Sequence, residues 1–237
     1  MSLINLIGKD TDEIRFNWVV SQLAMLRKGD RILDAGAGEL KFKPYCEHLE
    51  YVSQDFGQYD GDGDGRGLQT EKWDNSEIDI VSDITKVPVQ QEAFDAILRT
   101  EVFEHIPDAI AAVREFSRIL KPGGTLLITA PFNSLSHFAP YHFCGYNRYW
   151  YEYHLPANGL EIEVIDHNGS WFKFIAQELR RSRFVGRKYS SGLLGLVTRV
   201  ASIPLLILLT LLAKRDSGSQ ELLCFGFMVR ARKMTSK

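Results

Sequence analysis

The sequence predicts an α/β fold in which helices cover both faces of a doubly wound, mostly parallel sheet. Two observations predict this fold class. Along the 237 residues, segments with strand composition alternate with segments whose apolar positions have helical spacing. An acid and two glycines end the first predicted strand, which is where open α/β sheets bind their ligands. The length favours one domain over two.

The predicted helices are bounded by clear start and stop signals. A helix over 12–27 ends at Lys28-Gly29, and a second helix is expected at about 41–49. A third follows Pro107 and stops at Pro122-Gly123-Gly124, because proline and glycine cannot continue it. Seven strands are expected, at 31–34, 50–56, 78–82, 94–100, 125–132, 161–166 and 221–230.

Charge and cysteine content exclude several classes of protein. The 28 basic and 30 acidic residues leave a net charge of −2, so no nucleic-acid partner is expected. The three cysteines are far apart and have no zinc-ligand spacing, so neither a disulfide framework nor a metal site is expected. The first residues lack the pattern of a secretory signal, and we therefore expect a cytoplasmic protein.

The segment RILDAGAGE at 31–39 has the composition of a nucleotide-binding turn. Gly36 and Gly38 can let a ligand approach the backbone closely, although glycines also occur where a chain only turns a tight corner. Asp55 ends the second predicted strand about 20 residues further on, where an acid would hold the two hydroxyls of a ribose.

Five motifs in order resemble the class I S-adenosylmethionine-dependent methyltransferases, of the methyltransferase type 11 kind. They are RILDAGAGE, EYVSQDF, DIVSDITKVP, FDAILRTEVFEHIPD and RILKPGGTLLITAPF, and they cover 31–132. The resemblance implies an enzyme with S-adenosyl-L-methionine as its cofactor. It also implies a Rossmann-like methyltransferase fold, with a seven-stranded sheet whose last strand is antiparallel.

The resemblance also implies which residues bind the cofactor. The methionine part would be lined by Asp34, Gly36, Ala37 and Gly38, and the ribose by Asp55 and Phe56. Asp83 and Ile84 would contact the adenine. Arg99, Thr100 and Glu101 would form the floor beneath the methionine, with His105 beside it. Leu40 stands where family members often have a third glycine.

A nicotinamide-dependent oxidoreductase is a weaker alternative, because Lys41 replaces the last glycine of its motif. A cofactor-binding module without catalysis is another.

Within one domain, 1–237, the expected parts are a cofactor-binding half at 12–132 and a substrate-loop region at 133–158. A basic and apolar helical insertion at 171–215 then precedes the last strand at 221–230. The substrate loop is long and aromatic-rich, as functional loops often are. We expect a small or lipid-linked hydroxylated acceptor there, and the candidate catalytic residues are His142, His105, Tyr141 and His137. Trp150, Tyr151 and Tyr153 are expected to be the packed face of a helix.

A Gly/Asp-rich loop literally matches a calcium-binding pattern from Asp60 to Glu71. It leaves a strand rather than joining two helices, and Gly67 stands where the pattern normally has an apolar residue. We therefore expect a flexible, solvated loop.

The insertion at 171–215 combines nine basic residues and one acid with an uncharged run, VASIPLLILLTLLA. This composition is typical of a segment that touches an anionic membrane. Fourteen residues are too few for a full span, so the expectation is peripheral contact through 193–213 on the inner face of the membrane, which replacing Leu208 and Leu209 by Asp should abolish. The alternatives are burial against the sheet or in a homodimer, and Pro204 fits the first turn of a helix under each.

Overall fold

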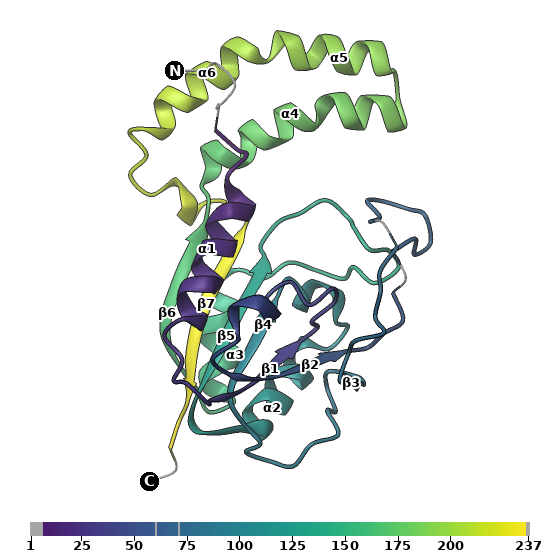
Figure 1. Ribbon diagram of the computed structural model, residues 1–237. Coiled ribbons are helices and arrows are strands. Elements are labelled where there is room, and N and C mark those ends of the chain that lie inside the picture. The colour runs from purple at the N-terminus through teal and green to yellow at the C-terminus, as the bar shows by residue number, and fades with distance from the viewer. Residues whose placement is uncertain (1–6, 60, 71, 236–237) are drawn as a thin grey trace. The chain divides into compact units, whose positions relative to one another are not determined.

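The computed structural model describes residues 7–59, 61–70 and 72–235 (Figure 1). The chain divides into two compact units. One unit consists of Met1–Arg15 and His167–Phe225, and the other of Phe16–Asp166 and Gly226–Lys237. The second unit contains most of the sheet and is called the sheet unit below, and the first is called the helical unit.

The sheet has seven strands in the order β3-β2-β1-β4-β5-β7-β6. Strands β1 to β5 pair in parallel, and β7 runs antiparallel to β5. The predicted fold class is therefore confirmed. The strands are β1 (Arg31–Ala35), β2 (Glu50–Asp55), β3 (Ile80–Val81), β4 (Phe94–Thr100), β5 (Leu120–Pro131), β6 (Leu160–Asn168) and β7 (Gly226–Lys233).

Helices lie on both faces of this sheet (Figure 1). Helix α1 (Thr11–Leu23) packs Val19 and Leu23 against alternate strand residues such as Ile32 and Leu98. Helix α2 (Ala109–Ile119) begins at Asp108, whose carboxylate caps the Ala111 N–H, and it buries an apolar stripe that ends at Ile119. Helix α3 (Arg148–Ala157) contacts α2.

The helix expected at 41–49 is wrong. The chain forms only the 3-10 turn η1 (Lys43–Tyr45), and the amides of residues 43, 45, 46 and 49 bond to carbonyls three residues back. Pro44 lacks an N–H and cannot donate the bond of a continuing α-helix. Leu40, which stands where the family often has glycine, has a φ of +58° and forces the chain to turn before this segment.

The starts of β3 and β6 differ from the expected ones by one or two residues, whereas β5 and β7 each begin five residues from the expected position. Strand β5 starts at Leu120, which pairs with Phe94 of β4; the register then shifts, and pairing resumes with Thr125 opposite Ala96. Strand β7 starts at Gly226 rather than 221. The residues before it form the turn η3 (Ser219–Glu221), which Asp216 holds by accepting bonds from Gly218 and Ser219.

Residues 171–215 form the helices α4 (Trp171–Tyr189), α5 (Gly192–Ala201) and α6 (Ile203–Ala213) of the helical unit. Helices α4 and α5 approach closely at Gly186 and Gly195, where a Cβ on Gly186 would lie 2.7 Å from the Gly195 Cα. In the described ranges no single helix is long and apolar enough to cross a membrane. The pair α5 and α6, bent by 45°, meets the length and composition test together.

Candidate active site

The turn after β1 requires its first glycine. Gly36 has a φ of +80°, and a Cβ at this position would lie 2.5 Å from the Val102 Cγ2. The amides of Gly36 and Ala37 both donate to the carbonyl of Gln54 on the neighbouring strand. Gly38 has a φ of +50° and lies under the ring of Trp73. The turn is therefore fixed close to β2, as a backbone that receives a ligand must be.

Asp55 lies at the carboxyl end of β2, beside this turn. Its buried carboxylate accepts the N–H of Gly38 at 3.1 Å and that of Gly57 at 2.9 Å. Each carboxylate oxygen has a further lone pair, so the group can still accept a ligand hydroxyl. The next residue, Phe56, meets the ring of Tyr141 edge-on at 5.1 Å. The expected ribose site and the substrate loop are thus adjacent.

Asp34 is buried at the end of β1 and accepts a bond of 2.7 Å from the Tyr51 hydroxyl. Burial raises the pKa of Asp34 to about 7, the Tyr51 bond opposes that rise, and the negative charge of Asp55 adds to it. No cation is among the groups that shift this pKa in the described part of the chain. A positively charged ligand group would therefore be favoured beside it.

The two residues expected at the adenine differ in exposure. Ile84 is buried, whereas Asp83 is exposed, and its carboxylate accepts bonds from the N–H and hydroxyl of Thr85. The Asp83 side chain is thus held as the cap of a turn.

The end of β4 brings together a buried cation and a strained residue. Arg99 is fully buried with its guanidinium 3.3 Å above the Phe103 ring, and its nitrogens have no hydrogen-bond partner among the described residues. Burial lowers the pKa of Arg99 to about 9. After Thr100, Glu101 has a φ of +52°, and its carboxylate accepts the Thr129 hydroxyl. Such strain is typical of functional sites.

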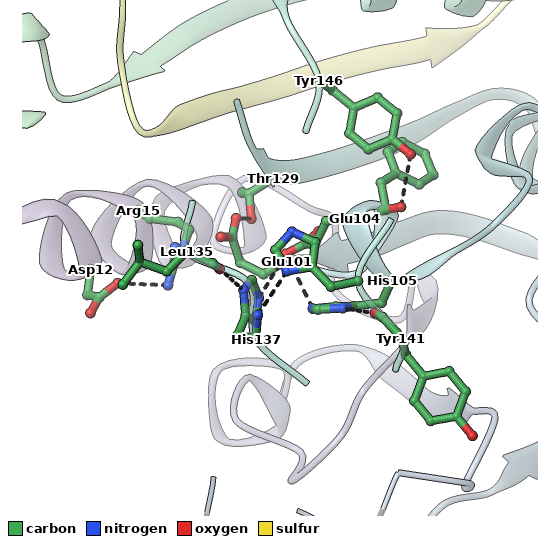
Figure 2. Close-up of polar contacts among 12 residues, drawn as sticks. Asp12, Arg15, Glu101, Glu104, His105, Thr129, Leu135, His137, Tyr141 and Tyr146 are labelled. Carbon is green, nitrogen blue, oxygen red and sulfur yellow. Dashed lines mark hydrogen bonds and ion pairs between the residues drawn. The ribbon is translucent and has the colours of Figure 1, made fainter. Parts of the chain in front are cut away.

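Three histidines gather at the carboxyl ends of β4 and β5. The centroid of the His137 ring lies 4.7 Å from the centroid of the His105 ring and 4.5 Å from that of the His142 ring. Figure 2 shows the rings of His105 and His137 beside Glu104, which belongs to the turn η2 (Phe103–His105). Three of the four expected catalytic side chains therefore form one cluster, whereas the Tyr141 ring is turned toward Phe56 and only its carbonyl reaches His105.

Hydrogen bonds decide where each imidazole carries its proton. The Nδ1 of His105 donates to the Tyr141 carbonyl, and the Nδ1 of His137 donates to the Leu135 carbonyl at 2.8 Å. In a neutral ring, each Nε2 then keeps its lone pair. His142 is different, because its Nδ1 accepts the His137 N–H at 2.9 Å. Burial lowers the pKa of His105 to about 3, so this ring is neutral at physiological pH.

The expected aromatic helix face is only partly packed. Tyr151 is fully buried, and Trp150 contacts the Phe103 ring at 5.5 Å. Tyr153 is 73% exposed, so its assignment to the packed face is wrong. The reason is helical geometry: Tyr153 is two residues from Tyr151, and such a spacing places the two side chains on different sides of α3.

The Gly/Asp-rich loop packs against the substrate loop instead of being wholly solvated. Leu68 donates to the Ser136 carbonyl and accepts from the Phe138 N–H. A Cβ on Gly67 would lie 2.5 Å from the Ser136 oxygen, so glycine is needed for this contact. Asp60 and Glu71, the first and last residues of the calcium pattern, lie outside the described residues.

Several residues of the site carry no signal in the sequence. The glycine turn contacts Val102 and Trp73, and the Asp34 carboxyl accepts the hydroxyl of Tyr51. The His105 ring of the histidine cluster stacks on Phe138. Glu104 could be found only as part of the EHI motif.

A glycine turn and an acid at the carboxyl ends of β1 and β2 define the class as an α/β protein with a nucleotide-type ligand site. Residues 33–128 match the family described as "Methyltransferase domain". The predicted resemblance to the class I methyltransferase family is therefore confirmed for this segment, which is less than half of the chain.

Curated relatives match only in a short segment. The ubiquinone biosynthesis O-methyltransferase of Xanthomonas campestris pv. campestris is 45% identical over 40 residues, which are 17% of this chain and 17% of that protein.

Solved structures share the fold over most of the chain. A putative sarcosine dimethylglycine methyltransferase from Galdieria sulphuraria has a TM-score of 0.56 and 16% identity, over 97% of this chain and 92% of the other. The phosphoethanolamine N-methyltransferase 2 of Haemonchus contortus, solved with S-adenosyl-L-methionine, has a TM-score of 0.51 and 16% identity, over 93% of this chain and 52% of the other. At these identities the two structures support the fold of this chain.

Proposed function

We propose that this protein transfers the methyl group of S-adenosyl-L-methionine to a small or lipid-linked hydroxylated acceptor. The observation that carries the proposal is that the expected cofactor site and the histidine cluster both lie at the carboxyl ends of the parallel strands. The glycine turn with Asp34 and Asp55 follows β1 and β2, and the histidine cluster follows β4 and β5. The edge-on contact of Phe56 with Tyr141 joins them. The short match to an O-methyltransferase of ubiquinone biosynthesis supports a hydroxylated, lipid-like acceptor.

When bound, the cofactor supplies a methyl group already activated by the sulfonium charge, so the chain's own task is mainly positioning. Asp55 would accept the ribose hydroxyls, and the Asp34 carboxylate would face the ammonium group of the methionine part. Ile84 offers an apolar contact for the adenine. The Arg99 side chain is buried over Phe103, so the backbone of β4 rather than this side chain would form the floor of the site.

The histidines that could contact the acceptor are His105 and His137. Each has its Nδ1 proton fixed on a carbonyl, which leaves a lone pair on Nε2. Because the pKa of His105 is lowered to about 3, we assign removal of the acceptor proton to His137. The Nδ1 lone pair of His142 is already used by the His137 N–H. A neutral His142 ring therefore carries its proton on Nε2, and we assign it to positioning the loop.

Cofactor binding tests the first part of the proposal. We expect S-adenosylmethionine and its demethylated product to raise the melting temperature, whereas NADH should leave it unchanged.

In calorimetry, Asp55→Ala should weaken cofactor binding by about ten-fold or more, since charge-assisted bonds contribute about 1.5 to 3 kcal/mol each. Equal affinity in this variant would remove Asp55 from the site. Methyl incorporation from labelled cofactor into hydroxylated quinols or a total lipid extract separates an enzyme from a binding module.

Asp34 makes cofactor binding dependent on pH. Because its pKa is about 7, most Asp34 carboxyls are protonated at pH 6 and ionised at pH 8. The ionised form attracts the cofactor's ammonium group, so affinity should rise by about ten-fold between these pH values. Asp34→Asn should bind weakly at both. If calorimetry finds the same pH dependence in Asp34→Asn, another group causes it.

The same shift affects the stability of the unliganded protein, with the opposite sign. The folded-state pKa of Asp34 lies above the ordinary value of 3.8 for this side chain. The protonated carboxyl therefore contributes stability that is complete below about pH 4 and lost as pH rises through about 7. Asp34→Asn should accordingly melt higher than the wild type at pH 8 while binding the cofactor less well.

His137→Ala should reduce turnover by about 100-fold or more and change cofactor affinity little, because general-base contributions are of that size. His142→Ala should cost less, about ten-fold, because it releases only the His137 N–H. Single-turnover rates and calorimetry measure the two effects separately. A larger loss in His142→Ala than in His137→Ala would return the activating role to His142.

We also infer that α5 and α6 contact the inner, cytoplasmic face of a membrane, where anionic lipids are concentrated. Large apolar side chains project from both helices into solvent, among them Leu193, Leu194, Val197, Val200, Leu205, Leu208, Leu211 and Leu212. The basic residues of α4 to α6 and of the chain just after them include Arg183, Arg187, Lys188, Arg199, Lys214 and Arg215, all exposed. Apolar surface with this positive charge fits an anionic lipid surface better than a neutral protein partner. A methyltransferase attached there would meet lipid-linked acceptors directly.

A further inference from the structure

Glu104, His105 and His137 each offer one possible ligand atom, and these three atoms lie within 4.8 Å of one another. We propose that the three residues bind a divalent transition-metal ion of the zinc type. The cysteine spacing gave no reason to expect a metal site; Glu104 and His105 follow β4, whereas His137 lies in the loop after β5. The carboxyl ends of these paired strands bring them together.

The carboxylate of this site is held deep in the sheet unit. The Glu104 side chain is fully buried, and its Oε1 lies 3.6 Å from the His105 Nε2 and 3.8 Å from the His137 Nε2. The Glu104 carbonyl accepts the Phe143 N–H, which ties the substrate loop to the same turn. The buried cation Arg99 attracts this carboxylate, and a coordinated ion would compensate its burial further.

Both imidazoles have the orientation that metal-binding histidines usually have. Their Nδ1 protons are donated to the backbone carbonyls of Tyr141 and Leu135, which fixes the tautomer and turns Nε2 toward Glu104. Figure 2 shows the two rings meeting beside the Glu104 carboxylate. Two lone pairs then face a carboxylate oxygen across less than 4 Å. A cation between them would turn this repulsion into attraction.

The distances suit a tetrahedral ion after a small adjustment. With nitrogen and oxygen ligands at about 2.0 to 2.1 Å from zinc, neighbouring ligand atoms are about 3.3 Å apart. The two distances from the Glu104 Oε1, 3.6 and 3.8 Å, exceed this value by about 0.3 and 0.5 Å, and the third pair of ligand atoms lies within 4.8 Å. Two histidines and one glutamate leave a fourth position open, as in catalytic zinc sites.

The open position gives the ion a role that rests on the proposed function. A hydroxylated acceptor bound there would have its hydroxyl pKa lowered by the metal, and its oxygen would be oriented for methylation. The ion would thus perform the activation assigned above to His137.

Metal binding can be tested without the cofactor and without activity. The full-length protein, stripped with a chelator and dialysed, is titrated with Zn²⁺ by calorimetry and with Co²⁺ by visible absorption. We expect one equivalent of Zn²⁺ with micromolar or tighter affinity and the absorption of a low-symmetry Co²⁺ site. Glu104→Gln and His137→Ala should each weaken binding by about 100-fold or more, since even the loss of an indirect partner costs 10- to 100-fold.

Three controls separate the possible failures. His154→Ala removes an imidazole from α3 and should leave Zn²⁺ affinity unchanged. Circular dichroism shows whether the variants fold, and His137→Ala changes a loop rather than the sheet. Asp55→Ala should lose cofactor affinity while keeping Zn²⁺, so loss of the cofactor site and loss of the metal site are distinguishable. Absence of saturable Zn²⁺ binding in the wild type, or full Zn²⁺ affinity in folded His137→Ala, overturns the proposal.

Discussion

Replacing Gly36 by alanine is expected to weaken binding of S-adenosylmethionine by about 100-fold. A non-glycine residue at a φ of +80° costs about 1 to 2 kcal/mol. The new Cβ would also lie 2.5 Å and 2.7 Å from the two γ-carbons of Val102, and such overpacking costs about 1 to 3 kcal/mol. The turn can relieve both only by moving, which breaks the bonds from Gly36 and Ala37 to the Gln54 carbonyl. Calorimetry measures the affinity.

Two further variants identify the cause of this loss. Gly29 has a nearly identical φ of +84°, but a Cβ there would meet nothing within 4 Å, so Gly29→Ala carries the backbone strain without the clash. It should lower the melting temperature slightly and leave cofactor affinity unchanged. Adding Val102→Ala to Gly36→Ala removes the clash and should restore part of the affinity. If Gly36→Ala binds as tightly as Gly29→Ala, the turn does not contact the cofactor.

The sequence was sufficient for the fold and for the position of the acids, because both depend on strand order. Asp34 and Asp55 end adjacent parallel strands, with Asp34 paired to Ser53 and Ala35 to Gln54. Their proximity therefore follows from the topology once the two strands are recognised. The same reasoning places the loops after β4 and β5 together.

What could not be predicted depends on contacts between distant backbone groups. The different proton positions of His137 and His142 result from a carbonyl at Leu135 and an amide at His137, and no composition rule specifies them. The burial of Arg99 over Phe103 likewise depends on the fold of the turn η2. Charge and histidine content predicted the region of the site, but they did not predict which ring nitrogen of each histidine carries the proton.

Helix α6 shows a second limit of sequence analysis. An apolar residue occupies nearly every position from Ile203 to Ala213, so the sequence has no polar face that marks the solvent side. The structure supplies the distinction: Leu208 is 51% exposed, whereas Leu209 is 4% exposed and packs with Ala176 and Leu206. The pair Leu208 and Leu209 is therefore the wrong choice for testing the surface, because Asp at 209 would disrupt the core of the helical unit.

Replacing Leu208 and Leu211 by Asp is accordingly expected to abolish attachment to anionic vesicles. Leu211 is 54% exposed and, with Leu208, faces solvent on α6. Removing each leucine from a lipid contact costs about 1.5 to 3 kcal/mol, and each added negative charge near an anionic surface costs about 1 kcal/mol more. The partition coefficient should fall by about 1,000-fold or more. Sedimentation with phosphatidylserine-rich vesicles at low salt measures it.

The controls separate lipid contact from charge and from dimerisation. Wild type should sediment at low salt and be released only partly at high salt, because screening weakens the contribution of the basic residues and not the apolar one. Met25→Asp changes an equally exposed apolar residue at 54%, outside the helical unit, and should leave attachment unchanged. Circular dichroism should show the double variant folded and Leu209→Asp destabilised. A wild type that stays in the supernatant as a stable dimer would make the α5 and α6 surface an interface between two copies of the chain.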